Sequence, residues 1–210
     1  MEKNGRIGKP EQDLILAGYM ALAGSVSLIP EEQEKLLERL PEELLQDACN
    51  AWEQMKMART GLAKAGWPQP VEADPLGQIE EDLLPQDMVS AGISAWYPVG
   101  QGGISNALWH MAQAWDTGFV VQMKEIPVRQ ETIEICEVLG INPYYLYSEH
   151  CMLIAADHGD RLCAALQKRG MAAAVIGVLH HNKDKVLQHD DTVSHLNRPR
   201  EDELARYHRV

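Results

Sequence analysis

The stretch that decides the fold is Pro98-Val99-Gly100-Gln101-Gly102-Gly103-Ile104-Ser105-Asn106-Ala107-Leu108-Trp109. Residues 93–97 before it predict a strand, and residues 104–116 predict a helix with an apolar inner face. A glycine turn between a strand and a helix exposes backbone N–H groups at the positive end of the helix dipole, where an anion can bind. Close packing of helix against strand explains Gly102 and Gly103 equally well. The candidate phosphate or ligand contacts are Gly100, Gln101, Gly102, Gly103 and Ser105.

Downstream of this turn, short apolar runs alternate with helical patterns. Residues 119–123, 151–156 and 172–179 predict strands, and residues 130–139 and 160–168 predict helices. Gly140 and Gly170 follow the two helices and are typical helix stops. From residue 88 onward we therefore expect about four strands and three helices, arranged as an α/β sandwich.

The front of the chain has a different pattern. Residues 13–19 are a short apolar run that predicts a buried strand. Pro30 and Pro41, each followed by glutamates, are typical of helix starts and predict helices at about 31–40 and 42–65. Residues 66–77 contain three prolines and two glycines, which predicts a linker, and Glu80-Glu81-Asp82 opens a short helical stretch after it.

Composition excludes several classes of partner. The formal net charge is −12, and no cluster of lysine and arginine offers a surface for nucleic acid. An acidic surface also disfavours anionic membranes. No stretch reaches the roughly 20 apolar residues that span a bilayer, and the first residues lack the apolar core of a signal peptide. We therefore expect a cytoplasmic protein that binds neither nucleic acid nor membrane.

Cysteine and histidine positions give no metal signature. Cys49, Cys136, Cys151 and Cys163 are scattered without ligand spacing, so free thiols are expected. His180-His181, with His189 and His195, invites a metal interpretation, but adjacent histidines on a strand point to opposite faces. Cys151 beside His150 invites a nucleophile interpretation, yet neighbours on a strand also point apart, which favours a buried thiol. We expect no metal site.

Several separated motifs occur in an order that resembles one known family. They are Gly102-Gly103-Ile104, Ile126-Pro127-Val128-Arg129-Gln130-Glu131-Thr132, Ile141-Asn142-Pro143-Tyr144, Met152-Leu153-Ile154-Ala155 and Val175-Ile176-Gly177. This order resembles the C-terminal domain of the aminoimidazole ribonucleotide (AIR) synthase superfamily, and within it the hydrogenase-maturation-factor-like proteins. The ending Arg198-Pro199-Arg200-Glu201-Asp202 resembles their tail. The resemblance spans about residues 88–205 and implies a mixed sheet with helices packed on it.

The resemblance also implies a domain division. Residues 8–25 look like the last strand and turn of the family's N-terminal ATP-binding domain. The expected division is therefore residues 1–30 as a remnant of that domain, residues 31–87 as a helical segment and linker, and residues 88–210 as the C-terminal-like domain. Family members bind ATP and Mg²⁺ chiefly through the N-terminal domain, most of which we expect to be missing. ATP and Mg²⁺ are thus implied by the resemblance alone.

The glycine turn departs from the family pattern. Relatives carry His-Asp-x-Thr-Glu-Gly-Gly where this chain has Tyr97-Pro98-Val99-Gly100-Gln101-Gly102-Gly103. The carboxylates and hydroxyl that could serve metal binding or proton transfer are replaced. The second polar loop, Ser148-Glu149-His150-Cys151, has His150 in place of a family glycine. No catalytic residue is therefore assigned.

Two functions remain open. The first is a truncated and degenerate family member that acts as a binding or assembly module. The second is a nucleotide- or phosphometabolite-binding subunit of a split ATP-dependent enzyme. The maturation factors use a C-terminal cysteine, and because this sequence ends Ala205-Arg206-Tyr207-His208-Arg209-Val210 we do not expect that mechanism in cis.

Two further site candidates and the partners complete the expectations. Arg129 is a candidate substrate contact or a local ion-pair partner, and Ser148 is a candidate ligand contact. The expected partner is a second copy, forming a homodimer, or a separate ATP-binding half. The dimer rests on residues 13–19, which as a lone edge strand would risk aggregation.

Overall fold

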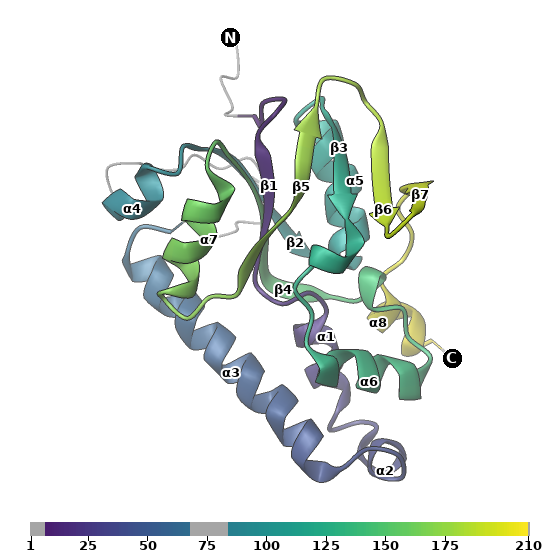
Figure 1. Cartoon of the computed structure of the whole chain (residues 1–210). Helices are drawn as coiled ribbons and strands as arrows, with labels where there is room; N and C mark the ends of the chain where they lie inside the picture. The colour runs from purple at the N-terminus through teal and green to yellow at the C-terminus, as the bar shows by residue number, and fades with distance from the viewer. Residues whose placement is uncertain (1–6, 68–83, 210) are drawn as a thin grey trace.

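One seven-stranded mixed sheet joins strands from both ends of the chain (Figure 1). The computed structural model describes residues 7–67 and 84–209. The strand order is β2-β4-β1-β5-β3-β6-β7, and every pairing is antiparallel except β3 with β6. The strands are β1 Asp13–Ala17, β2 Ile93–Gly100, β3 Gly118–Gln122, β4 Ser148–Ala156, β5 Ala173–His180, β6 Lys185–His189 and β7 Thr192–His195.

The first strand lies at the centre of this sheet. Leu14 pairs with Ala155 of β4 on one side and with Gly177 of β5 on the other. Residues 14–17 are all buried, as expected where both faces of a strand are covered. The expectation that residues 13–19 form a lone edge is therefore wrong, and the argument for a dimer from edge protection falls with it. The division at residues 30 and 87 stays a prediction.

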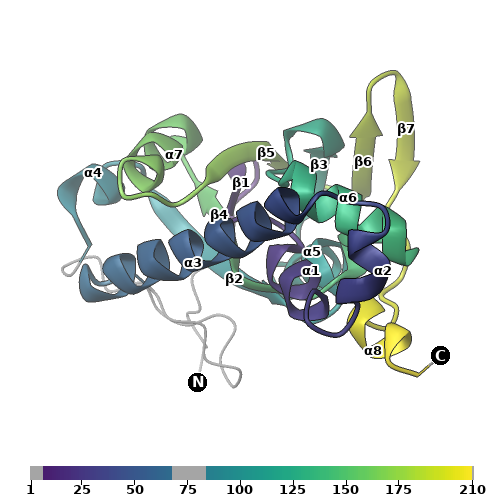
Figure 2. The same cartoon turned by 90° about the horizontal axis from the view of Figure 1, so that it is seen from below.

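Eight helices accompany the sheet in the described ranges. They are α1 Leu22–Leu28, α2 Gln33–Leu37, α3 Glu42–Lys64, α4 Gln86–Val89, α5 Gly103–Ala114, α6 Gln130–Leu139, α7 Gly159–Gln167 and α8 Glu203–Tyr207. α7 packs on β1, β4 and β5, whereas α5 packs on β2 and β4. α3 runs along the lower end of the sheet beside α1 and α6, as Figure 2 shows.

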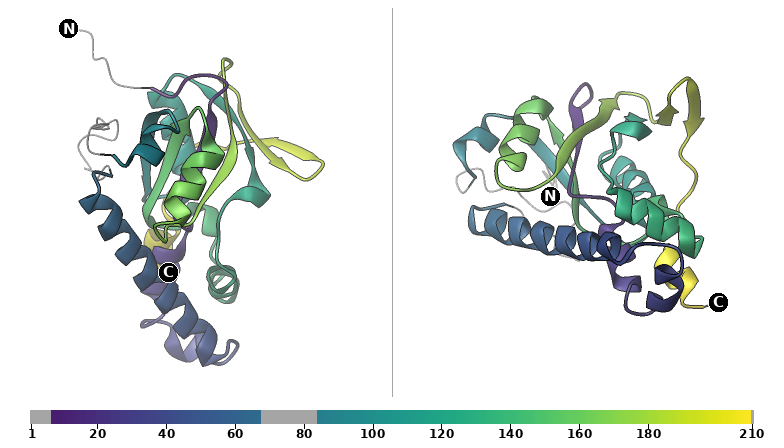
Figure 3. Two further views of the ribbon diagram at one scale, coloured as in Figure 1. Left: turned by 60° about the vertical axis from the view of Figure 1, so that its left-hand side comes forward. Right: turned by 60° about the horizontal axis from the view of Figure 1, so that its bottom comes forward.

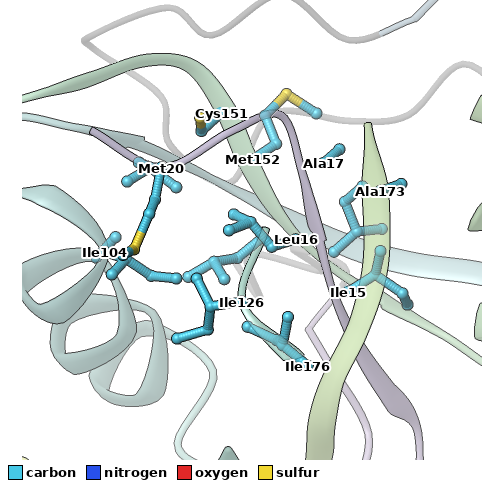
Figure 4. Close-up of a cluster of buried hydrophobic side chains, with 14 of the residues drawn as sticks. Ile15, Leu16, Ala17, Met20, Ile104, Ile126, Cys151, Met152, Ala173 and Ile176 are labelled. Carbon is cyan, nitrogen blue, oxygen red and sulfur yellow. The ribbon is translucent and has the colours of Figure 1, made fainter. Parts of the chain in front are cut away.

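The apolar core fills the space between the central strands and these helices. In Figure 4, Ile15 and Leu16 of β1 lie among side chains from distant parts of the chain, such as Ile126 and Ile176. All four of these side chains are at most 4% exposed. The run of apolar residues that predicted the first strand is therefore the middle of the core.

The predicted elements from residue 93 onward are confirmed, and the structure adds β6, β7, α8 and the short 3-10 helices Met123–Glu125 and Pro143–Tyr145. The hairpin of β6 and β7 projects from the body in Figure 3, and α8 follows it. No apolar alternation marks this hairpin, because β7 is exposed along its whole length and no residue of β6 is fully buried.

Residues 22–28, expected as part of a turn, form α1. The predicted linker lies mostly outside the described residues. The helical stretch that we expect to begin at Glu80-Glu81-Asp82 also starts outside them.

Candidate functional site

A pocket of about 820 Å³ lies where the glycine turn, the start of β4 and the C-terminal segment meet. We call residues 100–103 the glycine turn, residues 198–209 the tail segment, and this cavity the glycine-turn pocket. It is lined by Pro98, Val99, Gly100, Gln101, Tyr147, Glu149, His150, Cys151, Glu201, Asp202, Leu204, Ala205 and His208. Its volume falls in the range typical of small-molecule sites.

The glycines of the turn are required by backbone geometry. Gly100, Gly102 and Gly103 have φ values of +82°, +74° and +62°. A Cβ at Gly103 would lie 2.7 Å from the carbonyl oxygen of Tyr144, so this glycine also permits close packing. A Cβ at Gly100 would meet no heavy atom within 4 Å among the described residues. The packing explanation therefore holds for Gly103.

Gly102 uses its backbone N–H to hold an anion, and the anion is part of the same chain. The N–H donates to Oδ2 of Asp202 over 2.5 Å. Oδ1 of Asp202 accepts the N–H of Leu204 at the start of α8. Close packing also applies at Gly102, where a Cβ would lie 1.9 Å from Nδ2 of Asn106, and binding of an external anion at this glycine stays a prediction.

A second pair of hydrogen bonds holds the tail segment against α5. The side chain of Asn106 donates to the carbonyl of Arg200 over 2.7 Å and accepts the N–H of Arg200 over 3.2 Å. The Arg200 guanidinium lies 3.6 Å from the ring centroid of Tyr145. The tail segment is thus an integral wall of the glycine-turn pocket.

The two serine candidates lie outside the pocket lining. Ser105 is buried in the first turn of α5. The buried Ser148 hydroxyl accepts the N–H of Ala21 over 2.8 Å and donates to the carbonyl of Leu146 over 2.9 Å. Ser148 therefore ties β4 to the start of α1.

Arg129 also lies away from the pocket lining. Its guanidinium pairs with Glu131 at 2.6 Å and lies 5.7 Å from the ring centroid of Tyr19. The hydrogen bond from Arg129 lowers the pKa of the Glu131 carboxyl, and the same bond raises the pKa of Arg129. The structure therefore shows the local ion pair.

His150 and Cys151 form the floor of the pocket near α3. His150 has φ +63°, so it keeps the left-handed backbone that glycine adopts easily. Its ring stacks on Trp52 of α3 with centroids 5.2 Å apart. Burial raises the pKa of the Cys151 thiol to about 12, and its sulfur donates to the carbonyl of Tyr19. A thiol held in this way is not a nucleophile at neutral pH.

The charges that line the pocket are acidic. Glu149, Glu201 and Asp202 line it, and no lysine or arginine is among the lining residues. Glu201 pairs with Arg209, and His208 pairs with Glu31 at 2.9 Å. These residues do not fit a magnesium nucleotide, because the lining has no lysine or arginine for the phosphates, the described residues form no group of three metal-ligating side chains, and the Gly102 N–H is already bonded.

The part of the chain that the structure describes has neither a metal-ligating cluster nor a membrane-spanning helix. No group of three or more histidine, cysteine, aspartate or glutamate side chains within residues 7–67 and 84–209 could hold a metal ion. No helix in that part of the chain is long and apolar enough to cross a membrane.

Sequence reasoning missed Glu149 and Asp202 as pocket residues. Asp202 carries a readable signal, since an aspartate just before Glu203 and Leu204 is typical of a helix N-cap. Its bond to Gly102, 100 residues earlier, has no sequence signal. Glu149 lies in a loop that departs from the family pattern, and a single glutamate there gives no sequence signal for a pocket.

Comparisons with known proteins agree with this architecture. The carbamoyl dehydratase HypE of Rhodobacter capsulatus is 29% identical over 106 residues, which are 49% of this chain and 30% of that protein. The crystal structure of E. coli HypE has a TM-score of 0.66 at 20% identity and covers 97% of this chain and 55% of that one. A chain in the crystal structure of a HypE–HypF complex gives a TM-score of 0.61 at 17% identity, covering 92% of this chain and 55% of that one.

The similarity to these relatives covers only part of their length. The chain spans about half the length of the HypE structures and a smaller part of the curated relative. The sequence profile described as AIR synthase related protein, C-terminal domain, matches residues 53–190, which are more than half of the chain. With the mixed sheet and the glycine turn in place, the chain belongs to the AIR synthase related family through this C-terminal domain.

Proposed function

We propose that this protein is a binding or assembly module built on the AIR synthase related fold, without independent ATP-dependent catalysis. The observation that carries the proposal is the hydrogen bond from the Gly102 N–H to Asp202. The donor that a phosphate would need at the helix start is used by a carboxylate of the same chain. The fold of a ligand-binding enzyme is thus kept, and its anion position has become a structural contact.

The electrostatics of the pocket support the same proposal. Two like charges 4 Å apart repel by about 4 kcal/mol at the effective dielectric constant of a protein surface. A triphosphate without a bound metal ion would meet Glu149, Glu201 and Asp202 in the glycine-turn pocket, with no lining lysine or arginine to offset them. The carboxylate and hydroxyl positions that the family uses are occupied here by Pro98, Gly100 and Gln101.

A partner protein is part of the proposal. HypE has been crystallised in a complex with HypF, so a relative of the same fold assembles with another protein. We infer that this chain likewise acts with a partner, either a separate ATP-binding half or a second copy of itself. Light scattering at micromolar concentration tests whether the partner is a second copy, because a monomeric mass contradicts the homodimer.

The experiment that tests the absence of catalysis uses the purified chain with ATP and Mg²⁺. Isothermal titration calorimetry is expected to show no heat of ATP binding, and a phosphate-release assay is expected to stay at the rate of buffer alone. Hydrolysis that disappears in Gln101→Ala would overturn the proposal, because Gln101 lies in the glycine turn. Hydrolysis that is unchanged by Gln101→Ala points to a contaminating ATPase. The assay is then repeated on protein that has been purified further, and the expected rate is again that of buffer alone.

The second candidate is a subunit of a split ATP-dependent enzyme. The observation that favours it is the pocket volume of about 820 Å³ beside the glycine turn, which is large enough for a nucleotide. In this case ATP hydrolysis would appear only when a separately encoded ATP-binding half is added, and Gln101→Ala would lower it. Absence of hydrolysis in that mixture favours the binding module.

A further inference from the structure

We propose that the glycine-turn pocket binds an arginine or lysine side chain presented by a segment of a partner polypeptide. The inference rests on the proposed function, because it names the kind of partner that the binding module takes. The pocket combines three carboxylates and no lining lysine or arginine with a half-buried imidazole and several apolar lining residues.

The carboxylate available to a ligand is Glu149. Asp202 already accepts two backbone N–H groups, and Glu201 pairs with Arg209. Glu149 is exposed and has no side-chain hydrogen bond or ion pair to any residue within 7–67 and 84–209. A cation in the pocket would therefore find one open carboxylate, with the other two adding to the attraction.

The neighbour of Glu149 does not oppose a cation. Burial lowers the pKa of His150, and the nearby Arg59 and Lys56 lower it further, whereas Glu149 raises it. Burial therefore favours the neutral form of the ring, and its stack on Trp52 fixes its orientation. Lys56 pairs with Glu53 at 2.6 Å, and neither Lys56 nor Arg59 lines the pocket.

The remaining walls suit the aliphatic part of a basic side chain. Pro98 and Val99 of β2 and Leu204 and Ala205 of the tail segment supply apolar surface. Arginine and lysine bury their methylene stems against such surface while the charged head reaches a polar partner. An arginine side chain should bind more tightly than a lysine side chain here, because its planar guanidinium can bind a carboxylate through two parallel hydrogen bonds.

The position of the pocket points to a polypeptide rather than a small cation. Pro98, Val99 and Gly100 belong to β2, the outermost strand on that side of the sheet. Extended segments bind at outer strands through main-chain hydrogen bonds and insert side chains into adjacent pockets. A volume of about 820 Å³ also leaves room for the residues on either side of the basic one.

The test uses short peptides that carry one charge, so that attraction to the net charge of −12 stays small. The probe is an end-capped pentapeptide Ala-Leu-Arg-Leu-Ala that carries an uncharged BODIPY label, measured by anisotropy against the full chain. Matched peptides carry lysine or glutamine at the centre, and end-capped free arginine serves as competitor. We expect the arginine peptide to bind more tightly than the glutamine peptide, and added salt to weaken it.

Two variants locate the binding. Glu149→Gln removes the open carboxylate and is expected to weaken binding by about five-fold, as for loss of one partly exposed charge pair. Glu38→Gln, on the exposed end of α2 outside the pocket lining, removes the same charge and is expected to leave binding unchanged. Equal weakening by both variants, or equal affinity for the glutamine peptide, would overturn the proposal.

Two other outcomes are decisive. If end-capped arginine competes at the same concentration as the pentapeptide, the site takes a small cation and the partner segment is overturned. If ATP and Mg²⁺ bind the chain and the arginine peptide does not, the proposed function fails together with this inference. If neither binds, only this inference fails, because the absence of ATP binding is what the binding module predicts.

Discussion

The N–H of Gly102 donates to the Asp202 carboxylate over 2.5 Å, joining residues 100 positions apart in the sequence. This bond places a carboxylate at the start of α5, where the helix dipole favours negative charge. It also fixes the tail segment as a wall of the glycine-turn pocket. The contact thus supplies a negatively charged partner for the start of α5 from within the same chain.

Removing this carboxylate should loosen the tail segment. Asp202→Ala loses the bond to Gly102 and the N-cap of α8, and we expect a loss of about 2 kcal/mol in the free energy of unfolding of this region. Amide hydrogen exchange should become faster at Gly102 and Leu204. Asp191→Ala, on the exposed turn between β6 and β7, is the matched control. Equal exchange rates in both variants would contradict the structural role of Asp202.

Two glycines of the same turn should respond differently to alanine. Both have positive φ, so each substitution carries the strain of a left-handed backbone, about 1 kcal/mol. At Gly103 the new Cβ would also meet the Tyr144 carbonyl oxygen at 2.7 Å, which raises the expected cost to about 3 kcal/mol. Urea denaturation measures both values. Gly100→Ala is the control for strain alone, and equal costs would show that the clash at Gly103 relaxes.

The stability of the protein should fall in mild acid because of His150. Its pKa is lowered in the folded state, mainly by burial, so the unfolded chain takes up a proton first as the pH falls. The contribution of His150 is fully present above the ordinary pKa of 6.5 and is lost as the pH falls through and below that value. His150→Asn keeps a residue that tolerates positive φ and should flatten this part of the pH profile.

Chemical denaturation at a series of pH values between 7.5 and 5 gives the profile. Trp52→Ala removes the ring that covers His150 and should move its pKa back toward the ordinary value in an NMR titration. An unchanged pH profile in His150→Asn would assign the acid sensitivity to other groups.

The thiols should differ strongly in reactivity. Burial raises the pKa values of Cys136 and Cys151 to about 12 and that of Cys163 to about 11. Cys49 on α3 is less buried, and its pKa is raised less. We expect iodoacetamide at pH 8 to modify Cys49 first and the others only after unfolding in urea. Mass spectrometry of tryptic peptides measures the order in which the cysteines are modified. Early labelling of Cys151 would support the interpretation of this thiol as a nucleophile in the pocket.

Local patterns in the sequence were enough to predict the elements that have strong local signals. The apolar run at residues 13–19, the glycine stop at Gly140 and the proline start at Pro41 each depend on neighbours in sequence, and β1, α6 and α3 are confirmed. The β6–β7 hairpin was missed because its strands are exposed and carry no apolar period. The central place of β1 was missed because pairing between distant strands leaves no local trace.

The candidate site was predicted in part. Gly100 and Gln101 line the pocket, because a glycine turn before a helix is a local signal. Arg129 and Ser148 were nominated from their motifs, and their nearest partners are Glu131 and Ala21. Glu149 and Asp202 enter the site through the fold of β4 and the docking of the tail segment, which no spacing in the sequence encodes.

The central place of β1 also sets when this protein can fold during its synthesis. β1 ends at Ala17, whereas its two partners end at Ala156 and His180. The middle of the sheet therefore cannot close until residue 180 has left the ribosome, and such distant pairings form slowly. Leu14, Ile15 and Leu16 thus lack their covering strands until residue 180 has been synthesised, and apolar segments left uncovered in this way are prone to aggregate.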